Sequence, residues 1–294
     1  MLINKGSELT YLENYRNGKI KAGLGIGNNL DNYLRLKQGQ LNIMLGHDNV
    51  GKTFFFTYYM LSHAIINNKT FCIWSGENSS GQIMRDLIQM YVGMHFKKIP
   101  LQTIRSAYNF LSQFFTFVDN RKLYKPEELF LIFESEDADV CFIDPFTGLD
   151  RKMTYEGNYE FLNDARQFCN NTKKTLYVSS HPNSESGRAG NLYPEKHEWA
   201  QHLKPPLKAS IEGGKAFLNR SCDMFTVHRL CSHPTMKYET MVSIEKIKDK
   251  ETGGQLTDLN MPLLFNFNNG LGFTTQGVDN LKDYRFKTTQ TRIK

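Results

Sequence analysis

The segment from Gly46 to Thr53 constrains the fold of this chain more than any other. It reads Gly-His-Asp-Asn-Val-Gly-Lys-Thr and matches the phosphate-binding pattern G-x-x-x-x-G-K-[ST]. Glycines let the backbone curl, so that successive N–H groups point inward at phosphate oxygens. In this pattern Lys52 places an ammonium between the β- and γ-phosphates, and Thr53 offers a hydroxyl to Mg²⁺. The predicted nucleotide-binding residues are Gly46, Asp48, Asn49, Val50, Gly51, Lys52 and Thr53.

The flanking sequence supports this interpretation, because the pattern requires a strand before the loop and a helix after it. Residues 40–45 are an apolar run that predicts a buried strand, and residues 54–66 are an apolar stretch of helical length. The bound anion would then face the positive N-terminal end of that helix. The alternative, a surface turn that contains two glycines by chance, does not account for this context.

The composition predicts a globular protein with a sizeable core. The 294 residues allow one large domain or two small ones, and 40% of them are hydrophobic. A net charge of +6 weakly favours a polyanionic partner. The five cysteines form no C-x-x-C pair, which favours small buried hydrophobes in a reducing compartment. Since no signal-peptide run or membrane-length apolar stretch occurs, we expect a cytoplasmic protein without membrane contact.

Expected strands and helices alternate along most of the chain, which favours an α/β fold with a mainly parallel central sheet flanked by helices. The expected strands after the P-loop cover residues 70–75, 115–118, 140–144, 175–179, 224–227 and 239–244. Residues 183–208 show no periodicity and carry three of the nine prolines, so a functional or disordered loop is expected there. We divide the chain into a linker or docking segment (1–28), a nucleotide-binding domain (29–278) and a flexible basic tail (279–294).

Three polar residues at expected strand ends are candidates to complete a nucleotide site. Asp144 follows four apolar residues and has the form of a carboxylate that holds Mg²⁺ through water. Glu77 ends the strand after the P-loop helix, where a base could polarise the attacking water; a loop acid or helix cap is the alternative. His181 ends a later strand and could donate to the γ-phosphate, although a lone histidine is more often structural.

The order of these motifs resembles that of DnaB-like (superfamily 4) replicative helicases. The matching segments are the P-loop, Ser75-Gly76-Glu77, residues 139–144, Val178-Ser179-Ser180-His181-Pro182, and Gly213-Gly214-Lys215-Ala216 with Asp223. The chain looks most similar to the RecA-type motor domain of Twinkle and phage ring helicases, over roughly residues 25–275. The resemblance implies a RecA-like P-loop NTPase with ATP as substrate and Mg²⁺ as cofactor. It also implies Glu77 as catalytic base and His181 as γ-phosphate sensor.

The resemblance further implies two groups of residues outside the pocket. Loops at 183–206 and 213–215 would face a central channel and hold single-stranded DNA, although a solvated basic surface is the alternative. The DNA-binding candidates are Arg188, Lys204, Lys208, Gly214 and Lys215. Lys246 and Lys248 match the Lys-x-Arg pair that reaches a neighbouring site as a catalytic finger. The second residue here is lysine, which supplies charge without the planar two-pronged guanidinium, so the arginine-finger mechanism is in question.

Together these features predict an ATP-driven helicase that forms a ring, a hexamer by resemblance, and unwinds duplex DNA at replication forks. Two alternatives stay open: a RecA- or KaiC-like DNA-dependent ATPase without unwinding activity, and a nucleotide-locked assembly or loader subunit. The sequence shows no primase module and no N-terminal helical domain, which suits a phage or plasmid motor with a separate primase or loader. The first two dozen residues could supply a linker helix that docks on a neighbour.

Overall fold

The centre of the molecule is a nine-stranded sheet, in a computed structural model that describes residues 6–20, 22–152, 154–258 and 260–286. The strand order is β3-β2-β4-β5-β1-β6-β7-β8-β9. The parallel strands are β1 (Leu41–Leu45), β2 (Phe71–Ser75), β3 (Phe115–Phe117), β4 (Val140–Asp144), β5 (Thr175–Ser180) and β6 (Asp223–His228). Three antiparallel strands extend the sheet: β7 (Glu239–Lys246), β8 (Leu263–Phe267) and β9 (Phe273–Thr274). The predicted α/β class is therefore confirmed.

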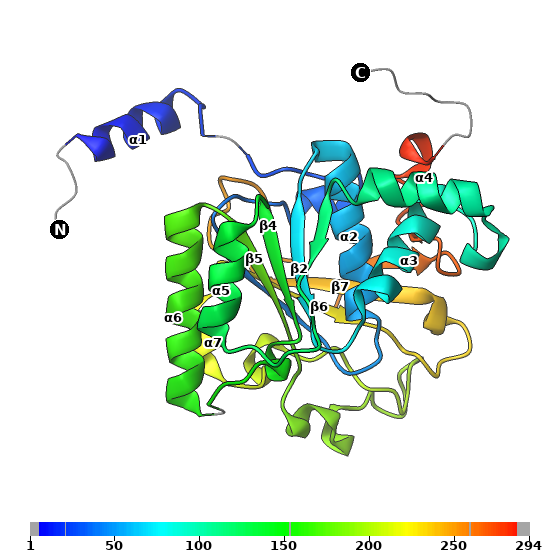
Figure 1. Cartoon of the computed structure of the whole chain (residues 1–294). Coiled ribbons are helices and arrows are strands. Elements are labelled where there is room, and N and C mark those ends of the chain that lie inside the picture. Colours follow the sequence, from blue (N-terminus) through cyan, green and yellow to red (C-terminus); the bar gives the residue numbers. More distant parts are fainter. Residues whose placement is uncertain (1–5, 21, 153, 259, 287–294) are drawn as a thin grey trace.

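Helices cover both faces of this sheet (Figure 1). One face carries α2 (Lys52–Asn67), α3 (Ser80–Val92) and α4 (Leu101–Leu111). The other face carries α5 (Pro126–Ser135), α6 (Tyr155–Thr172) and α7 (Lys215–Arg220). The short helix α1 (Ser7–Arg16) extends away from the body (Figure 1). Within the described ranges, every helix is too short or too polar to span a lipid bilayer.

The parallel strands read as continuous apolar runs because both of their faces are buried. Successive side chains of a strand point to opposite faces of the sheet, so each apolar strand contributes side chains to two hydrophobic cores. In β4, Val140 and Phe142 belong to the core under α2, α3 and α4, whereas Cys141 and Ile143 belong to the core under α5, α6 and α7. Four of the five cysteines are buried as expected, and Cys231 is exposed.

Two segments of the chain differ from regular secondary structure or from the predicted boundaries. Residues 181–214 contain short 3₁₀ turns and isolated bridges, such as Leu192 with Leu203, which agrees with the absence of periodicity there. The predicted flexible tail from residue 279 is packed on the domain as far as Phe286, whose N–H donates to the Tyr91 carbonyl oxygen (3.0 Å). Leu281 is fully buried in the same stretch. Residues 287–294 lie outside the described residues.

Candidate nucleotide site and its surroundings

The loop between β1 and α2 has the backbone conformation that a phosphate cradle requires. Gly51 precedes α2 with φ of 89°, in the left-handed region that glycine adopts at little cost. A Cβ at Gly46 would collide with the carbonyl oxygen of Val227 on β6, so only glycine fits where the loop leaves the sheet. The loop thus lies against the carboxyl end of β6, and its last N–H groups open toward the start of α2.

Lys52 lies inside this loop rather than in solvent. Its ammonium donates to the carbonyl oxygens of Gly46 (2.9 Å) and His47 (2.8 Å), and only 7% of the residue is exposed. Burial lowers the pKa of Lys52, and the nearby carboxylates of Asp144 and Asp48 partly oppose that shift. A desolvated cation of this kind interacts strongly with an anion that enters the loop.

Thr53 and Asp144 bring two oxygens together beside Lys52. The Thr53 hydroxyl donates to Oδ2 of Asp144 at 2.7 Å, and Asp144 is almost fully buried. Burial raises the pKa of Asp144, while the hydrogen bond from Thr53 acts in the opposite direction. A hydroxyl and a carboxylate are the hard oxygen donors that Mg²⁺ prefers, so the donor chemistry of the predicted metal residues fits that ion.

Glu77 and His181 complete the cluster from two further strand ends. Glu77 follows β2 and His181 follows β5, and Nε2 of His181 lies 3.8 Å from Oε1 of Glu77. The other ring nitrogen, Nδ1, lies 2.6 Å from Oδ1 of Asp48 in the P-loop and 3.3 Å from the Lys52 ammonium. The imidazole therefore bridges the P-loop and Glu77, and the predicted pocket residues converge at one edge of the sheet.

The structure does not bring Lys246 and Lys248 to this pocket. Because β7 runs antiparallel to β6, Lys246 pairs with Met224 near the edge opposite the P-loop. The Lys246 ammonium donates to the carbonyl oxygens of Leu218 and Ser221 (2.6 Å for Ser221), at the carboxyl end of α7. It is thus occupied within its own chain, whereas the resemblance implied a finger that reaches into a neighbouring site. Lys248 is exposed, and its backbone N–H donates to Oδ1 of Asp223 (3.2 Å).

The predicted DNA-binding cations are all exposed, but most already have partners. Arg188 pairs with Glu185 (3.4 Å), and the Lys204 ammonium lies 6.0 Å from the ring centroid of Tyr193. The Lys208 ammonium donates to the backbone oxygen of Glu245 at 3.0 Å.

Lys215 differs from the other predicted cations in its setting. It begins α7, a helix that the sequence analysis did not predict, directly after Gly214 with φ of 78°. In the described part of the chain, the Lys215 side chain has no hydrogen bond or ion pair. It is therefore the candidate most available for a phosphate contact.

The sequence analysis did not identify two arginines that lie near the P-loop and the predicted DNA-binding residues. The Arg229 guanidinium carbon lies 3.9 Å from the place that a Cβ on Gly51 would take, and 5.5 Å from the ring centroid of Phe267. Arg229 directly follows β6, and β6 lies next to β1, the strand that precedes the P-loop. A cation just after a strand can be seen in the sequence. The local sequence does not show that β6 adjoins β1, so Arg229 could not be assigned to the pocket.

The second of these residues, Arg151, lies between the Asp144 strand end and the glycine pair at 213–214. Its guanidinium stacks 3.5 Å from the Phe146 ring centroid and donates to Oδ1 of Asn158 at 2.6 Å. A cavity of about 330 Å³ separates it from Gly213 and Gly214. The segment after β4 and the segment before α7 therefore face one another across this cavity.

Comparisons with known proteins identify the fold. No family model matches the sequence, and no curated protein sequence matches it. Among solved structures, the chain is similar to one described as an "ATPase Domain" (TM-score 0.72, 12% identity, 92% of this chain and 99% of that chain). It is equally similar to a protein solved in "The Structure Of A DnaB-Like Replicative Helicase And Its Interactions With Primase" (TM-score 0.72, 12% identity, 92% and 68%). The chain thus has the RecA-like fold of DnaB-type helicase ATPase domains, as the resemblance predicted.

Proposed function

We propose that this chain is the motor of a ring-forming replicative DNA helicase, which hydrolyses ATP, translocates on single-stranded DNA and unwinds duplex at forks. The observation that carries the proposal is the convergence of the P-loop, Thr53, Asp144, Glu77 and His181 at one edge of a RecA-like sheet. A P-loop alone would support nucleotide binding. The additional carboxylate and imidazole are the groups that hydrolysis needs.

Each residue of the cluster has a role that its position supports. Lys52 and the P-loop N–H groups bind the phosphates, and His181, when protonated at Nε2, donates to the γ-phosphate. Glu77 accepts the proton of the attacking water, since its carboxylate is 58% exposed and lies 3.8 Å from His181. Thr53 and Asp144 would hold Mg²⁺, which supplies positive charge against the phosphate oxygens when bound.

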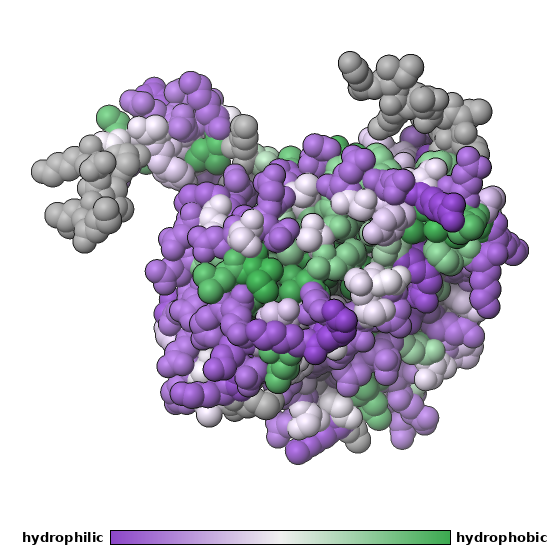
Figure 2. Space-filling view, in the orientation of Figure 1, coloured by the Kyte–Doolittle hydropathy of each residue, from purple (hydrophilic) through white to green (hydrophobic). Residues whose placement is uncertain are grey.

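Assembly into a ring is supported by two features on opposite sides of the molecule (Figure 1). Helix α1 protrudes and shows hydrophobic patches on its surface (Figure 2). Its side chains Leu9 and Leu12 are each 59% exposed. A groove of about 550 Å³ lies between α3 and α4 and is lined by apolar residues such as Met84 and Ile104. Docking α1 of one copy in this groove of the next is a head-to-tail contact, which closes into a ring when the rotation permits. A hexamer is the proposed stoichiometry.

The same arrangement gives Lys248, but not Lys246, a function between copies. Lys248 is exposed and lies at the sheet edge opposite its own P-loop, so its ammonium would serve the pocket of a neighbouring copy rather than its own. Lys215 and the other exposed cations of residues 183–215 would contact DNA phosphates, without reading the base sequence. A primase or a loader is a further proposed partner, because one structural neighbour is a DnaB-like replicative helicase described with its interactions with primase.

Steady-state ATP turnover, measured with and without single-stranded DNA, tests the proposal. The parent chain is expected to hydrolyse ATP faster when DNA is present, and Glu77→Gln is expected to bind ATP but to hydrolyse it only at a small residual rate. Turnover that DNA does not change would favour an ATPase that does not act on DNA. Absence of turnover under both conditions would favour a nucleotide-locked assembly or loader subunit.

A further inference from the structure

The turn between β2 and α3 carries Glu77 at its apex, yet the side chain itself is weakly held. In the described part of the chain the Glu77 carboxylate makes no hydrogen bond, and 58% of the side chain is exposed. Its nearest charged neighbour is His181 at 3.8 Å. The position of the carboxylate must therefore come from the backbone of the turn rather than from contacts of its own.

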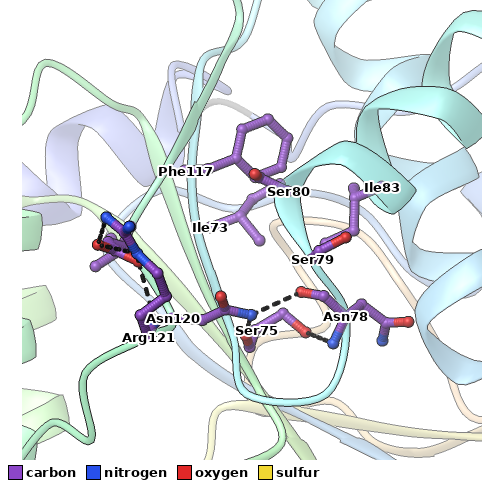
Figure 3. Close-up of a pocket in the computed structure, with 11 residues that line it drawn as sticks. Ile73, Ser75, Asn78, Ser79, Ser80, Ile83, Phe117, Asn120 and Arg121 are labelled. Carbon is purple, nitrogen blue, oxygen red and sulfur yellow. Dashed lines mark hydrogen bonds and ion pairs between the residues drawn. The ribbon is translucent and has the colours of Figure 1, made fainter.

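One side chain from another part of the chain spans this turn (Figure 3). The amide nitrogen of Asn120, in the loop after β3, donates to the carbonyl oxygens of Ser75 (2.9 Å) and Asn78 (3.1 Å). These carbonyls flank Glu77 on either side. Since both partners are acceptors, the nitrogen and not the oxygen of the amide faces the turn.

Among the described residues, Asn120 is the only side chain from outside β2, the turn and α3 that hydrogen-bonds to residues 75–79. The Gln82 side chain of α3 accepts from the Ser79 N–H (2.8 Å), but this contact caps the helix that directly follows the turn. The Gly76 N–H donates to the Asp144 carbonyl oxygen (2.8 Å), and the Asn78 N–H donates to Oγ of Ser75 (3.0 Å) within the turn. A cavity of about 520 Å³ adjoins the turn and is lined by Ile73, Ile83 and Phe117 among others (Figure 3). Packing therefore does not hold the turn on this side.

We infer that Asn120 is a positioning residue for Glu77, which fixes the turn so that the carboxylate meets the attacking water. The inference rests on the proposed ATPase function. A base must lie within hydrogen-bond reach of the proton that it takes, and a displacement of about 1 Å can cost about 10²-fold in rate. Loss of two hydrogen bonds across the turn permits such a displacement without disturbing the P-loop, which lies on a different strand end.

Steady-state kinetics of Asn120→Ala and Asn120→Asp test the inference. Both are expected to lower kcat by about 10- to 100-fold while ATP affinity stays within about twofold of the parent. Asn120→Asp preserves shape but presents an acceptor to two carbonyl oxygens, so it should be at least as slow as Asn120→Ala. Arg121→Ala is the matched control: its side chain lines the same cavity but pairs only with Asp119 among the described residues, and parental kcat is expected.

A double variant separates positioning from a general structural effect. If Asn120 acts through Glu77, adding Asn120→Ala to Glu77→Gln should not slow the residual rate further, because the base is already absent. Multiplicative losses in the double variant, or parental kcat in Asn120→Ala, would overturn the inference while leaving the proposed function intact. A parent chain without ATP turnover would remove the proposed function and this inference with it.

Discussion

The Thr53 hydroxyl donates a 2.7 Å hydrogen bond to Oδ2 of Asp144, although 91 positions separate the two residues in the sequence. Thr53 belongs to the first turn of α2 and Asp144 ends β4, two strands away from β1 in the sheet. Parallel strands that end at one edge bring such distant residues together. This pair, together with Lys52, defines the centre of the candidate site.

Lys52→Ala should weaken ATP binding by at least about tenfold, because the triphosphate loses a charge-assisted hydrogen bond in a desolvated loop. Titration of a fluorescent ATP analogue measures this. Lys97→Ala is the control, since Lys97 is exposed in a 3₁₀ turn beside α3. Equal affinity in Lys52→Ala and the parent would exclude the P-loop as the phosphate site.

Lys248→Ala should lower ATP turnover by about tenfold or more without changing the free energy of unfolding, because the side chain is exposed and would act on a neighbour. Mixing this variant with Glu77→Gln should partly restore turnover, since some interfaces then combine an intact base with an intact lysine. Failure to restore turnover in freely exchanging rings would argue against catalysis between subunits.

Lys246→Ala should differ from Lys248→Ala, because it should change the stability of the fold. Its ammonium closes the carboxyl end of α7, so its loss should reduce the free energy of unfolding by about 1 kcal/mol, measured by urea titration. Unchanged stability in Lys246→Ala would show that these hydrogen bonds do not stabilise the fold, and would again allow the role in a neighbouring site that the resemblance implied.

Lys215→Ala should weaken binding of single-stranded DNA for all sequences alike and reduce the slope of log affinity against log salt by about one unit. Its ammonium has no partner within the described residues, so stability should not change. Labelled oligonucleotides titrated at several salt concentrations measure the slope, with Lys282→Ala as an exposed control. A parental slope and affinity would remove Lys215 from the DNA interface.

The sequence predicted the parallel strands and the pocket residues because these depend on local patterns. Residues 140–143 are apolar because both faces of β4 are buried, and Asp144 follows directly at the strand end. The contacts of Lys246 could not be predicted, because its acceptors are backbone carbonyls of a helix brought near by tertiary packing. Asn120 and Arg229 lie in segments without periodicity, and their partners depend on the strand order.

His63 should make the fold less stable in acid. Burial within α2 lowers its pKa to about 3, with a small contribution from Lys69, and Asn67 donates to its Nδ1 at 3.0 Å. The unfolded chain takes up a proton at His63 below its ordinary value of about 6.5, whereas the folded chain does not until about pH 3. Stability is therefore lost as the pH falls from about 6.5 toward 3, at about 1.4 kcal/mol per unit.

His63→Leu removes this proton uptake. Between pH 7 and pH 5 its free energy of unfolding should fall by about 2 kcal/mol less than that of the parent, measured by urea titration at each pH. Identical losses in the two proteins would show that His63 is not buried in its neutral form. The comparison uses the change with pH, so any constant effect of the substitution on packing cancels.

Unwinding of a forked DNA duplex tests the central claim most directly. The parent chain is expected to separate the strands of a labelled fork in the presence of ATP and Mg²⁺, and Glu77→Gln is expected to bind the fork without separating it. ATP hydrolysis that DNA stimulates, without strand separation by the parent chain, would contradict the claim and assign the chain to DNA-dependent ATPases that do not unwind.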